Sequence, residues 1–223
     1  MAGGEKALAS IARAYPAPIY TLVHSQKDWK EAFPGPIHTS FIQKLPFASQ
    51  LYRHYFPLFP LAIEQFDFSS YERVISVSHA VAKGAMTTAE QLHLCYCLTP
   101  VRYAWDLTHR YLERTGVLQR AFARPCLHYL RNWDSASVNR VDHFATISRA
   151  MARRIQKVYN RYSTIIHPPV ATHAALFSEA KEEYYLTASR LVPYKRIDLI
   201  VEAFSLMPDC KLVVVGEGPE RKK

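Results

Sequence analysis

The sequence predicts an α/β fold of the doubly wound type, in which helices cover both faces of a mainly parallel sheet. Apolar runs typical of strands alternate along the chain with segments of helical periodicity. The runs at 73–77 and 92–97 are compact rather than strictly alternating, which suits strands buried on both faces. A new strand–helix–strand pattern begins after residue 183. These three observations favour parallel β-α-β architecture over an all-helical or all-strand fold.

The first hundred residues predict one clear helix and several short strands. Leu8, Ile11, Ala12 and Tyr15 follow the spacing of one helix face. The aromatic segment 47–66 contains two prolines, so we expect a helix that ends near Tyr55 and then an irregular apolar stretch. The predicted elements are a helix over 5–15 and strands over 19–23, 39–42, 73–77 and 92–97.

The rest of the chain continues the alternation. Ser148 is a good N-cap for a helix whose inner face carries Met151, Ile155, Val158 and Tyr159, while Arg153, Arg154 and Lys157 face solvent. The predicted elements are helices over 100–114, 117–140 and from 149, strands over 144–147, 164–166, 184–188 and 211–215, and a helix marked by Ile197, Ile200, Val201 and Phe204.

A domain boundary is expected after residue 167. Pro168 and Pro169 cannot continue a ladder or a helix, and the stretch that follows has weak periodicity. We therefore predict a first domain over 1–167, a linker over 168–183, and the start of a second domain over 184–223.

Charge and composition limit the classes of function. The net charge is +9, and residues 101–165 hold twelve basic and four acidic residues, an excess of eight. Such a basic surface suits polyanions, phosphorylated ligands or an anionic membrane, although a merely solvated surface explains it equally well. The longest apolar stretch, 55–63, is far shorter than the roughly 20 residues of a spanning helix. Four cysteines with one C-x-C pair predict neither a zinc site nor a disulfide scaffold, and suit a reducing cytoplasm.

Two loops are candidates for phosphate binding. Gly3 and Gly4 precede the first helix, where backbone N–H groups can approach an anion, although a flexible terminus is the simpler interpretation. The segment 189–196 joins a buried strand to a helix at the carboxyl end of a parallel sheet. Arg190 and Lys195 flank it and could converge on a diphosphate; the alternative is two solvated cations.

Several ordered motifs resemble glycosyltransferase family 4, especially its mannosyltransferase-like members in surface-polysaccharide assembly. They are GGEK (3–6), IYTLVH (19–24), VISVSHAVAKG (74–84), CYCLTPVRYAWDL (95–107), NRVDHFATIS (139–148), HPPV (167–170), YLTASRLVPYKRIDLIVEAF (185–204) and VVGEGPE (214–220). The resemblance covers nearly the whole chain. It implies a GT-B fold with two Rossmann-like domains around a cleft, the first lacking its opening strand and the second represented by its first β-α-β unit.

The resemblance also implies a chemistry. It is retaining transfer of a hexose, with mannose from GDP-mannose as one candidate, to a saccharide or lipid-linked acceptor at the cytoplasmic membrane face. The positions of Arg190 and Lys195 bind the donor phosphates in that family, and those of Gly3 and Gly4 approach the same phosphates. No cofactor is implied. The sequence has no Asp-x-Asp that would hold a metal-bridged diphosphate.

Three departures from the family pattern put activity in doubt. The strand before the glycine pair and the later acidic E-x7-E motif are missing, so we expect a chain truncated at both ends. Leu98 stands where the family has a histidine, and leucine can neither donate nor accept a hydrogen bond. The catalytic residue is therefore unknown, and we expect impaired activity. A misassigned start at Met1 and a premature stop at Lys223 would also explain the missing motifs.

Other residues are weaker candidates. His79 could line the cleft or be a structural histidine, and Arg102 could meet the acceptor. Gly216 and Gly218 form a second cleft-side loop. The aromatic segment 52–66 could touch a lipid-linked acceptor or the membrane, or simply pack under the first domain. The rival function is a non-catalytic basic module for nucleotide, anionic lipid or nucleic acid; for the transferase we expect no nucleic-acid partner.

Overall fold

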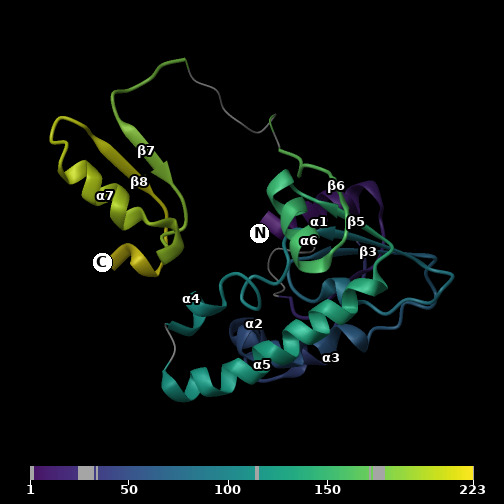
Figure 1. The fold of residues 1–223 in the computed structure, drawn as a ribbon. Coiled ribbons are helices and arrows are strands. Elements are labelled where there is room, and N and C mark those ends of the chain that lie inside the picture. The colour runs from purple at the N-terminus through teal and green to yellow at the C-terminus, as the bar shows by residue number, and fades with distance from the viewer. Residues whose placement is uncertain are drawn as a thin grey trace. The chain divides into compact units, whose positions relative to one another are not determined.

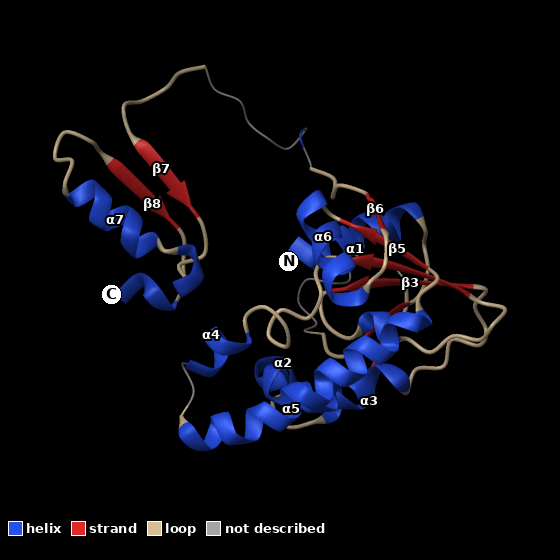
Figure 2. Cartoon of the chain, viewed as in Figure 1, coloured by secondary structure: helices blue, strands red, loops and turns tan. Residues whose placement is uncertain are grey.

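The chain forms two compact units, residues Met1–Val170 and Ala171–Lys223, and each is described here by itself. The computed structural model describes residues 3–24, 33, 35–113, 116–170, 172 and 179–222, without the side chains of 110, 111 and 222. Of the predicted linker over 168–183, residues 171 and 173–178 lie outside the described residues. Every described sheet is parallel and strands alternate with helices, so the predicted α/β fold is confirmed (Figures 1 and 2).

The first unit contains two parallel sheets. The larger has the strand order β3-β4-β5-β6, and these strands span Arg73–Ser78, Leu92–Cys97, His143–Thr146 and Ser163–Ile165. The smaller pairs β1 (Ile19–Thr21) with β2 (Ile37–Thr39). The larger sheet has apolar side chains where helices cover it, because its central strands must bury both faces.

In the described part of the first unit, six α-helices accompany these sheets. They are α1 (Gly3–Ala14), α2 (Ala48–Leu51), α3 (Phe59–Glu64), α4 (Thr108–Glu113), α5 (Val117–Ala136) and α6 (Arg149–Tyr159). The Ser148 hydroxyl accepts a hydrogen bond from the Met151 N–H at 3.3 Å, which confirms the predicted N-cap of α6. Ile155 and Tyr159 are buried as expected, but Arg154 is not solvated: it is half-buried and forms an ion pair with Asp106.

Three predicted elements differ from the structure. The strand expected over 39–42 ends at Thr39, because the Ser40 hydroxyl accepts the Ile42 N–H and starts a short 3-10 helix instead. A single helix was expected over 100–114, but in the structure only Thr108–Glu113, which is α4, is helical. The stretch expected to be irregular is helical as far as Glu64, with a 3-10 helix over Tyr52–Leu58 followed by α3. Pro60 is tolerated there because it lies in the first turn of α3, where its missing N–H has no intrahelical partner.

The second unit is a single β-α-β unit. It consists of β7 (Tyr185–Ala188), α7 (Ile197–Ser205) and β8 (Leu212–Val215), with β7 and β8 parallel. Many apolar side chains remain exposed, among them Leu186 at 59% and Val215 at 53%. Two strands and one helix bury little apolar surface, because a sheet of this size has one face uncovered.

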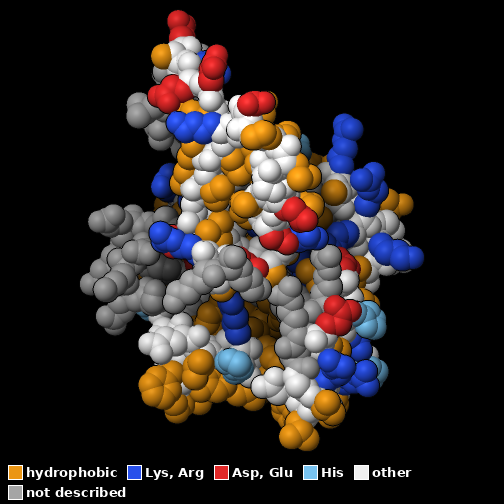
Figure 3. Space-filling model, turned by 90° about the vertical axis from the view of Figure 1, so that its left-hand side faces the viewer, with side chains coloured by type: hydrophobic (Ala, Val, Ile, Leu, Met, Phe, Trp, Pro, Cys, Tyr) orange, Lys and Arg blue, Asp and Glu red, His pale blue; other side chains and the backbone are white. Residues whose placement is uncertain are grey.

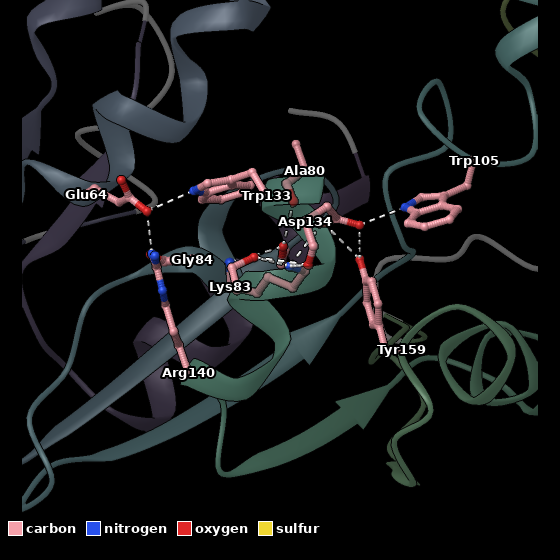
Figure 4. A network of polar contacts seen from close by, with 11 residues as sticks. Glu64, Ala80, Lys83, Gly84, Trp105, Trp133, Asp134, Arg140 and Tyr159 are labelled. Carbon is pink, nitrogen blue, oxygen red and sulfur yellow. Dashed lines mark hydrogen bonds and ion pairs between the residues drawn. The ribbon is translucent and has the colours of Figure 1, made fainter. Parts of the chain in front are cut away.

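A buried polar network ties α5 to the end of β3 (Figure 4). Lys83 and Asp134 form an ion pair of 3.0 Å with both side chains fully buried. The Lys83 ammonium also donates to the Asp134 carbonyl oxygen at 2.6 Å and to the Ser137 hydroxyl at 2.5 Å. The Asp134 carboxylate accepts from the Trp105 indole at 2.7 Å and from the Tyr159 hydroxyl at 3.0 Å. The network satisfies all three donors of the ammonium, which a buried charge requires.

A second polar cluster surrounds His93 in the interior of the larger sheet. Its Nδ1 lies 2.7 Å from the Arg140 carbonyl oxygen, so this nitrogen carries the proton and donates it. Its Nε2 then accepts from the Ser76 hydroxyl at 2.8 Å. Both ring nitrogens are satisfied in the neutral form, and burial lowers the pKa of His93 against the opposing effects of the Arg140 carbonyl and the Asp142 carboxylate.

This cluster predicts a pH dependence of stability. Below the ordinary histidine pKa of about 6.5, the unfolded chain binds a proton that the folded His93 resists, so the free energy of unfolding should fall as the pH falls. We expect urea denaturation between pH 7.5 and 5 to show this slope, and a His93→Gln variant to show a shallower one. Equal slopes in the two proteins would show that His93 does not carry the effect.

Candidate functional site

A pocket of about 360 Å³ opens at the carboxyl ends of β1 and β3. Parallel α/β sheets bind their ligands at this edge, because the loops there connect strands to helix N-termini. The lining comes from the start of α1, the residues that follow β1, the residues that follow β3, and the α2–α3 region: Gly4, Glu5, Leu8, Tyr20 to His24, Ser49, Tyr52, Phe59, Ile63, Val77 and His79 to Ala82.

Gly4 and His79, both singled out from the sequence, line this pocket, and Leu98 lies next to Gly4. Gly4 lies in the first turn of α1, and a Cβ atom placed on it would be 3.0 Å from Leu98 Cδ1 and 4.0 Å from His79 Nδ1. The glycine therefore lets Leu98 approach the α1 backbone. Gly3 has open space around it and is exposed. The first N–H groups of a 12-residue helix have no intrahelical partner, so this helix start can bind an anion.

His79 supplies an imidazole that is partly open to solvent. More than a third of its surface is exposed, yet it lies in the pocket wall among protein atoms. Desolvation lowers the pKa of His79, and the Glu5 carboxylate opposes that shift. A neutral imidazole at this position can accept a proton or donate a hydrogen bond to a ligand in the pocket.

Arg102 does not join the pocket within the described part of the chain. It is exposed in the turn that follows β4, and the pocket lining does not include it. Its charge acts instead on Arg154: burial, and then the Arg102 guanidinium, lower the pKa of Arg154. Arg102 therefore belongs to a cationic surface next to the Arg154–Asp106 ion pair.

In the second unit, the two loops expected to face a cleft are joined to one another. The Ser189 N–H donates to the Val215 carbonyl oxygen at 3.0 Å, and the Leu191 N–H donates to the Glu217 carbonyl oxygen at 2.9 Å. A Cβ atom on Gly216 would collide with the Ser189 oxygen, and one on Gly218 would collide with the Leu191 oxygen. Both glycines therefore allow close approach of two backbones.

Arg190 and Lys195 are both exposed on this pair of loops. Lys195 ends a 3-10 helix over Pro193–Lys195, immediately before α7. The neighbouring Arg196 is engaged, since its Nε lies 3.1 Å from the Asp198 carboxylate. No carboxylate of the described residues forms an ion pair with Arg190 or Lys195, so both charges are available to a ligand.

The sequence did not single out Glu5 or Tyr20, which the fold brings into the pocket. Hydrogen bonding and burial raise the pKa of Tyr20 to about 12, and the Tyr20 hydroxyl lies 3.1 Å from that of Tyr71. Glu5 lies within the motif GGEK and Tyr20 within IYTLVH, but neither was singled out as a site residue, and their meeting in one pocket follows only from the fold. That Gly3 and Gly4 meet the same diphosphate as Arg190 and Lys195 stays a prediction, because each unit is described by itself.

The comparison with protein families finds a match in the second unit. No curated protein matches the chain. The family model of glycosyl transferases group 1 matches residues 171–223, the range of the second unit. Together with the parallel α/β sheets, the match supports a glycosyltransferase of GT-B type that binds a sugar donor and an acceptor.

Proposed function

We propose that the chain belongs to a retaining glycosyltransferase of family 4. The donor is a nucleotide diphosphate hexose, with GDP-mannose as the first candidate, and the acceptor is a saccharide or a lipid-linked saccharide in surface-polysaccharide assembly. The observation that carries the proposal is the pair of exposed cations, Arg190 and Lys195, within the region that matches the glycosyl transferase family model. In this proposal residues 1–167 are the acceptor side, 168–183 a linker, and 184–223 the start of the donor-binding domain.

The mechanism that these residues support is electrostatic. When the bond between sugar and diphosphate breaks, negative charge develops on the leaving diphosphate. Arg190 and Lys195 would bind this charge, and the α1 N-terminus at Gly3 and Gly4 would add backbone donors. Leu98 lies against Gly4, which lines the pocket, and in this proposal an imidazole at position 98 would reach the reacting sugar or its developing charge. With leucine there, His79 offers a ring nitrogen in the same place, since its Nδ1 would lie 4.0 Å from a Cβ atom on Gly4.

The proposal predicts a gain of function at Leu98. Incubation with radiolabelled GDP-mannose and a lipid-linked acceptor should give slow transfer by the natural chain. Leu98→His should raise the rate by about ten-fold or more, because general acid–base or hydrogen-bonding groups contribute about 10²–10⁴-fold when well placed. Leu98→Gln serves as a polar control of similar size. Rapid transfer by the natural chain would contradict the expectation that its activity is impaired. Equal rates for the natural chain, Leu98→His and Leu98→Gln would contradict the role of position 98.

We further propose that the first unit docks on the cytoplasmic face of an anionic membrane. Large apolar side chains are exposed at the start of α5, namely Val117 at 82%, Leu118 at 86% and Phe122 at 67%. Arg120 and Arg124 alternate with them, and the only acid of α5, Asp134, is buried in the ion pair with Lys83. Apolar groups framed by cations suit an anionic lipid surface.

The adjoining α2 region extends this apolar surface. Phe47 is 67% exposed and holds a left-handed backbone conformation with φ 51°. Hydrophobic side chains gather along the lower edge of Figure 3, with Lys, Arg and His side chains beside them, on the side of the first unit where α2 and α5 lie in Figure 1. No helix within the described residues has the length and apolarity needed to cross a bilayer.

Vesicle binding tests the docking proposal. We expect co-sedimentation with vesicles containing anionic phosphatidylglycerol and little with pure phosphatidylcholine. A Leu118→Ser/Phe122→Ser variant should bind at least about ten-fold more weakly, because it removes the inserting groups. Tyr162→Ser, at a position 91% exposed in the same unit, is the matched control. If the double variant binds vesicles as well as the natural chain, the docking proposal is contradicted. The vesicle binding would then reflect a general affinity for polyanions, as expected for the rival function of a basic binding module.

A further inference from the structure

A second pocket lies between α5 and the segment that contains α4. Its volume is about 390 Å³, within the range of about 300–1,000 Å³ that is usual for small-molecule sites. One wall comes from α4 and the turn before it, and the other comes from α5. None of its lining residues lines the pocket at Gly4 and His79, so the two are separate sites.

The spacing of the residues explains why they face one space. Thr108, His109 and Leu112 lie on one side of α4, because residues three and four positions apart share a helix face. Arg124 and Arg131 are seven positions apart on α5, which places them on one face of that helix, about 10 Å apart along its axis. Both guanidinium groups can therefore reach one ligand.

The charged groups of this pocket are all basic. Arg124 and Arg131 supply two guanidinium groups, His109 supplies an imidazole, and no lining residue is acidic. Within the described part of the chain, no carboxylate forms an ion pair with either arginine. Two cations thus border one pocket without a counter-ion from the protein.

Arg131 is the cation that an anion would stabilise most. It is half-buried, and its Nη1 donates to the Ala104 carbonyl oxygen at 3.0 Å. That is the one hydrogen bond of this guanidinium to any described residue, although the group has five N–H donors. A merely solvated surface cation is the simpler explanation for basic charge, but it would have neither this burial nor this fixed position.

The Trp105 ring is held in place from behind the pocket. Its indole N–H donates to the Asp134 carboxylate at 2.7 Å, and Asp134 forms the buried ion pair with Lys83 (Figure 4). The buried network therefore fixes the ring, which lines the pocket together with Leu112. A wall that is already ordered reduces the entropy cost of binding a ligand.

These features suit a phosphate group with an organic substituent. A phosphomonoester carries about −1.5 to −2 charges near neutral pH, which two guanidinium groups balance, whereas a single carboxylate would leave one of them uncompensated. The planar fork of arginine also matches two phosphate oxygens at once. The ring of Trp105 and the side chain of Leu112 suit an apolar or planar substituent.

We propose that the pocket between α4 and α5 binds a phosphomonoester or diphosphate group. Arg124 and Arg131 bind the phosphate oxygens, the His109 imidazole adds a hydrogen bond, and the substituent lies against Trp105. The inference depends neither on the proposed transferase activity nor on the proposed membrane docking, because it rests on the pocket itself.

Two sources carry this chemistry. Free phosphorylated small molecules can enter the pocket from solvent. Lipids with phosphate headgroups can reach it from a membrane surface, because Leu118 and Phe122, which are 86% and 67% exposed, lie within the two turns of α5 before Arg124. The site is the same for both sources, and the experiment distinguishes them.

Fluorine NMR of the full chain labelled with 5-fluorotryptophan tests the site. The chain has three tryptophans, and a Trp105→Phe variant assigns the resonance of Trp105. With inorganic diphosphate as the probe, we expect a saturable shift of this resonance. The shift should persist in the Arg190→Gln/Lys195→Gln variant, which lacks the cations of the proposed donor loop. Absence of a saturable shift, or its loss in that variant, would overturn the proposal.

Variants of the two arginines give the second test. Arg124→Gln/Arg131→Gln should bind diphosphate at least about ten-fold more weakly, because it removes the charge-assisted hydrogen bonds. Arg149→Gln/Arg153→Gln, which removes two exposed arginines of α6, is the matched control and should stay within about two-fold. Equal losses in the two double variants would show a diffuse attraction and contradict the site.

A single variant covers the case in which loss of the Arg131 bond to Ala104 disturbs the fold. Arg124 is exposed and forms no ion pair with a described carboxylate, so Arg124→Gln should leave the Trp105 resonance unchanged without diphosphate. We expect it to bind diphosphate about five-fold more weakly or worse. Undiminished affinity would contradict the assignment of Arg124.

Two ligands with the same phosphomonoester identify the source. Glycerol 3-phosphate has no acyl chains, whereas dihexanoyl phosphatidic acid, used below its micelle concentration, has two. At least about ten-fold tighter binding of the lipid would support the site with a lipid headgroup as its ligand, and equal affinities would support it with a free phosphorylated molecule. If neither ligand shifts the Trp105 resonance, the proposal fails.

Discussion

Replacing Arg190 and Lys195 together with glutamine should reduce nucleotide-sugar binding by at least about 100-fold. Both side chains are exposed on the loop before α7, and no carboxylate of the described residues pairs with them. A hydrogen bond to a charged group contributes about 1.5–3 kcal/mol, and about 1.4 kcal/mol corresponds to a ten-fold change in affinity. Isothermal titration with GDP-mannose and with GDP measures the loss. GDP should be affected as strongly as the sugar nucleotide, because both carry the diphosphate.

The control is a double variant with the same change in charge. Lys181→Gln/Lys211→Gln removes two exposed cations elsewhere in the second unit and should leave binding within about two-fold. Heparin affinity should fall equally in both double variants, since it reports net charge and is steeply salt-dependent. If both double variants lose affinity for the nucleotide equally, nucleotide binding is a general effect of charge. That result would favour the basic binding module over the transferase.

Replacing Lys83 with methionine should cost about 3–5 kcal/mol of unfolding free energy. The substitution keeps most of the side-chain volume but leaves the fully buried Asp134 carboxylate without its ammonium partner. An uncompensated buried charge is among the most destabilising changes that a single substitution can make. Urea denaturation followed by circular dichroism measures the difference, and a marginally stable chain would be found unfolded without denaturant.

A second substitution tests the cause. Adding Asp134→Asn to the Lys83→Met variant removes the unpaired charge but keeps an oxygen that can accept from Trp105 and Tyr159. The double variant should therefore recover roughly half of the lost stability or more. Lys157→Met, on the exposed side of α6, should change stability by less than about 0.5 kcal/mol. If the double variant is less stable than Lys83→Met, the carboxylate itself is not the source of the cost.

The elements that could be predicted from the sequence are those with strong local signals. β4 spans Leu92–Cys97 as its apolar run predicts, and α6 begins at the Ser148 cap. The helix expected over 100–114 is much shorter, because the residues after Pro100 form turns and only 108–113 are helical. Local periodicity could not show this, since turns and a helix of that composition look alike along the sequence.

The candidate site was predictable only in part. The positions of Arg190 and Lys195 follow from the strand–helix junction and the resemblance, whereas the meeting of Gly4, His79 and Leu98 depends on how three separate segments fold together. Gly216 and Gly218 were expected at a cleft. The structure gives them a packing role against Ser189 and Leu191, which a sequence pattern cannot distinguish from ligand approach.

By itself, the sequence determined the α/β class, most strands, and the cationic loop before α7, because each depends on residues close together in the chain. The tertiary structure alone decided that Lys83 and Asp134 share one buried ion pair across 51 positions, and that Trp105, Arg124 and Arg131 line a common pocket. Burial and strand pairing are properties of the folded arrangement: a lysine is expected to be solvated when only the sequence is known, until the fold removes its water.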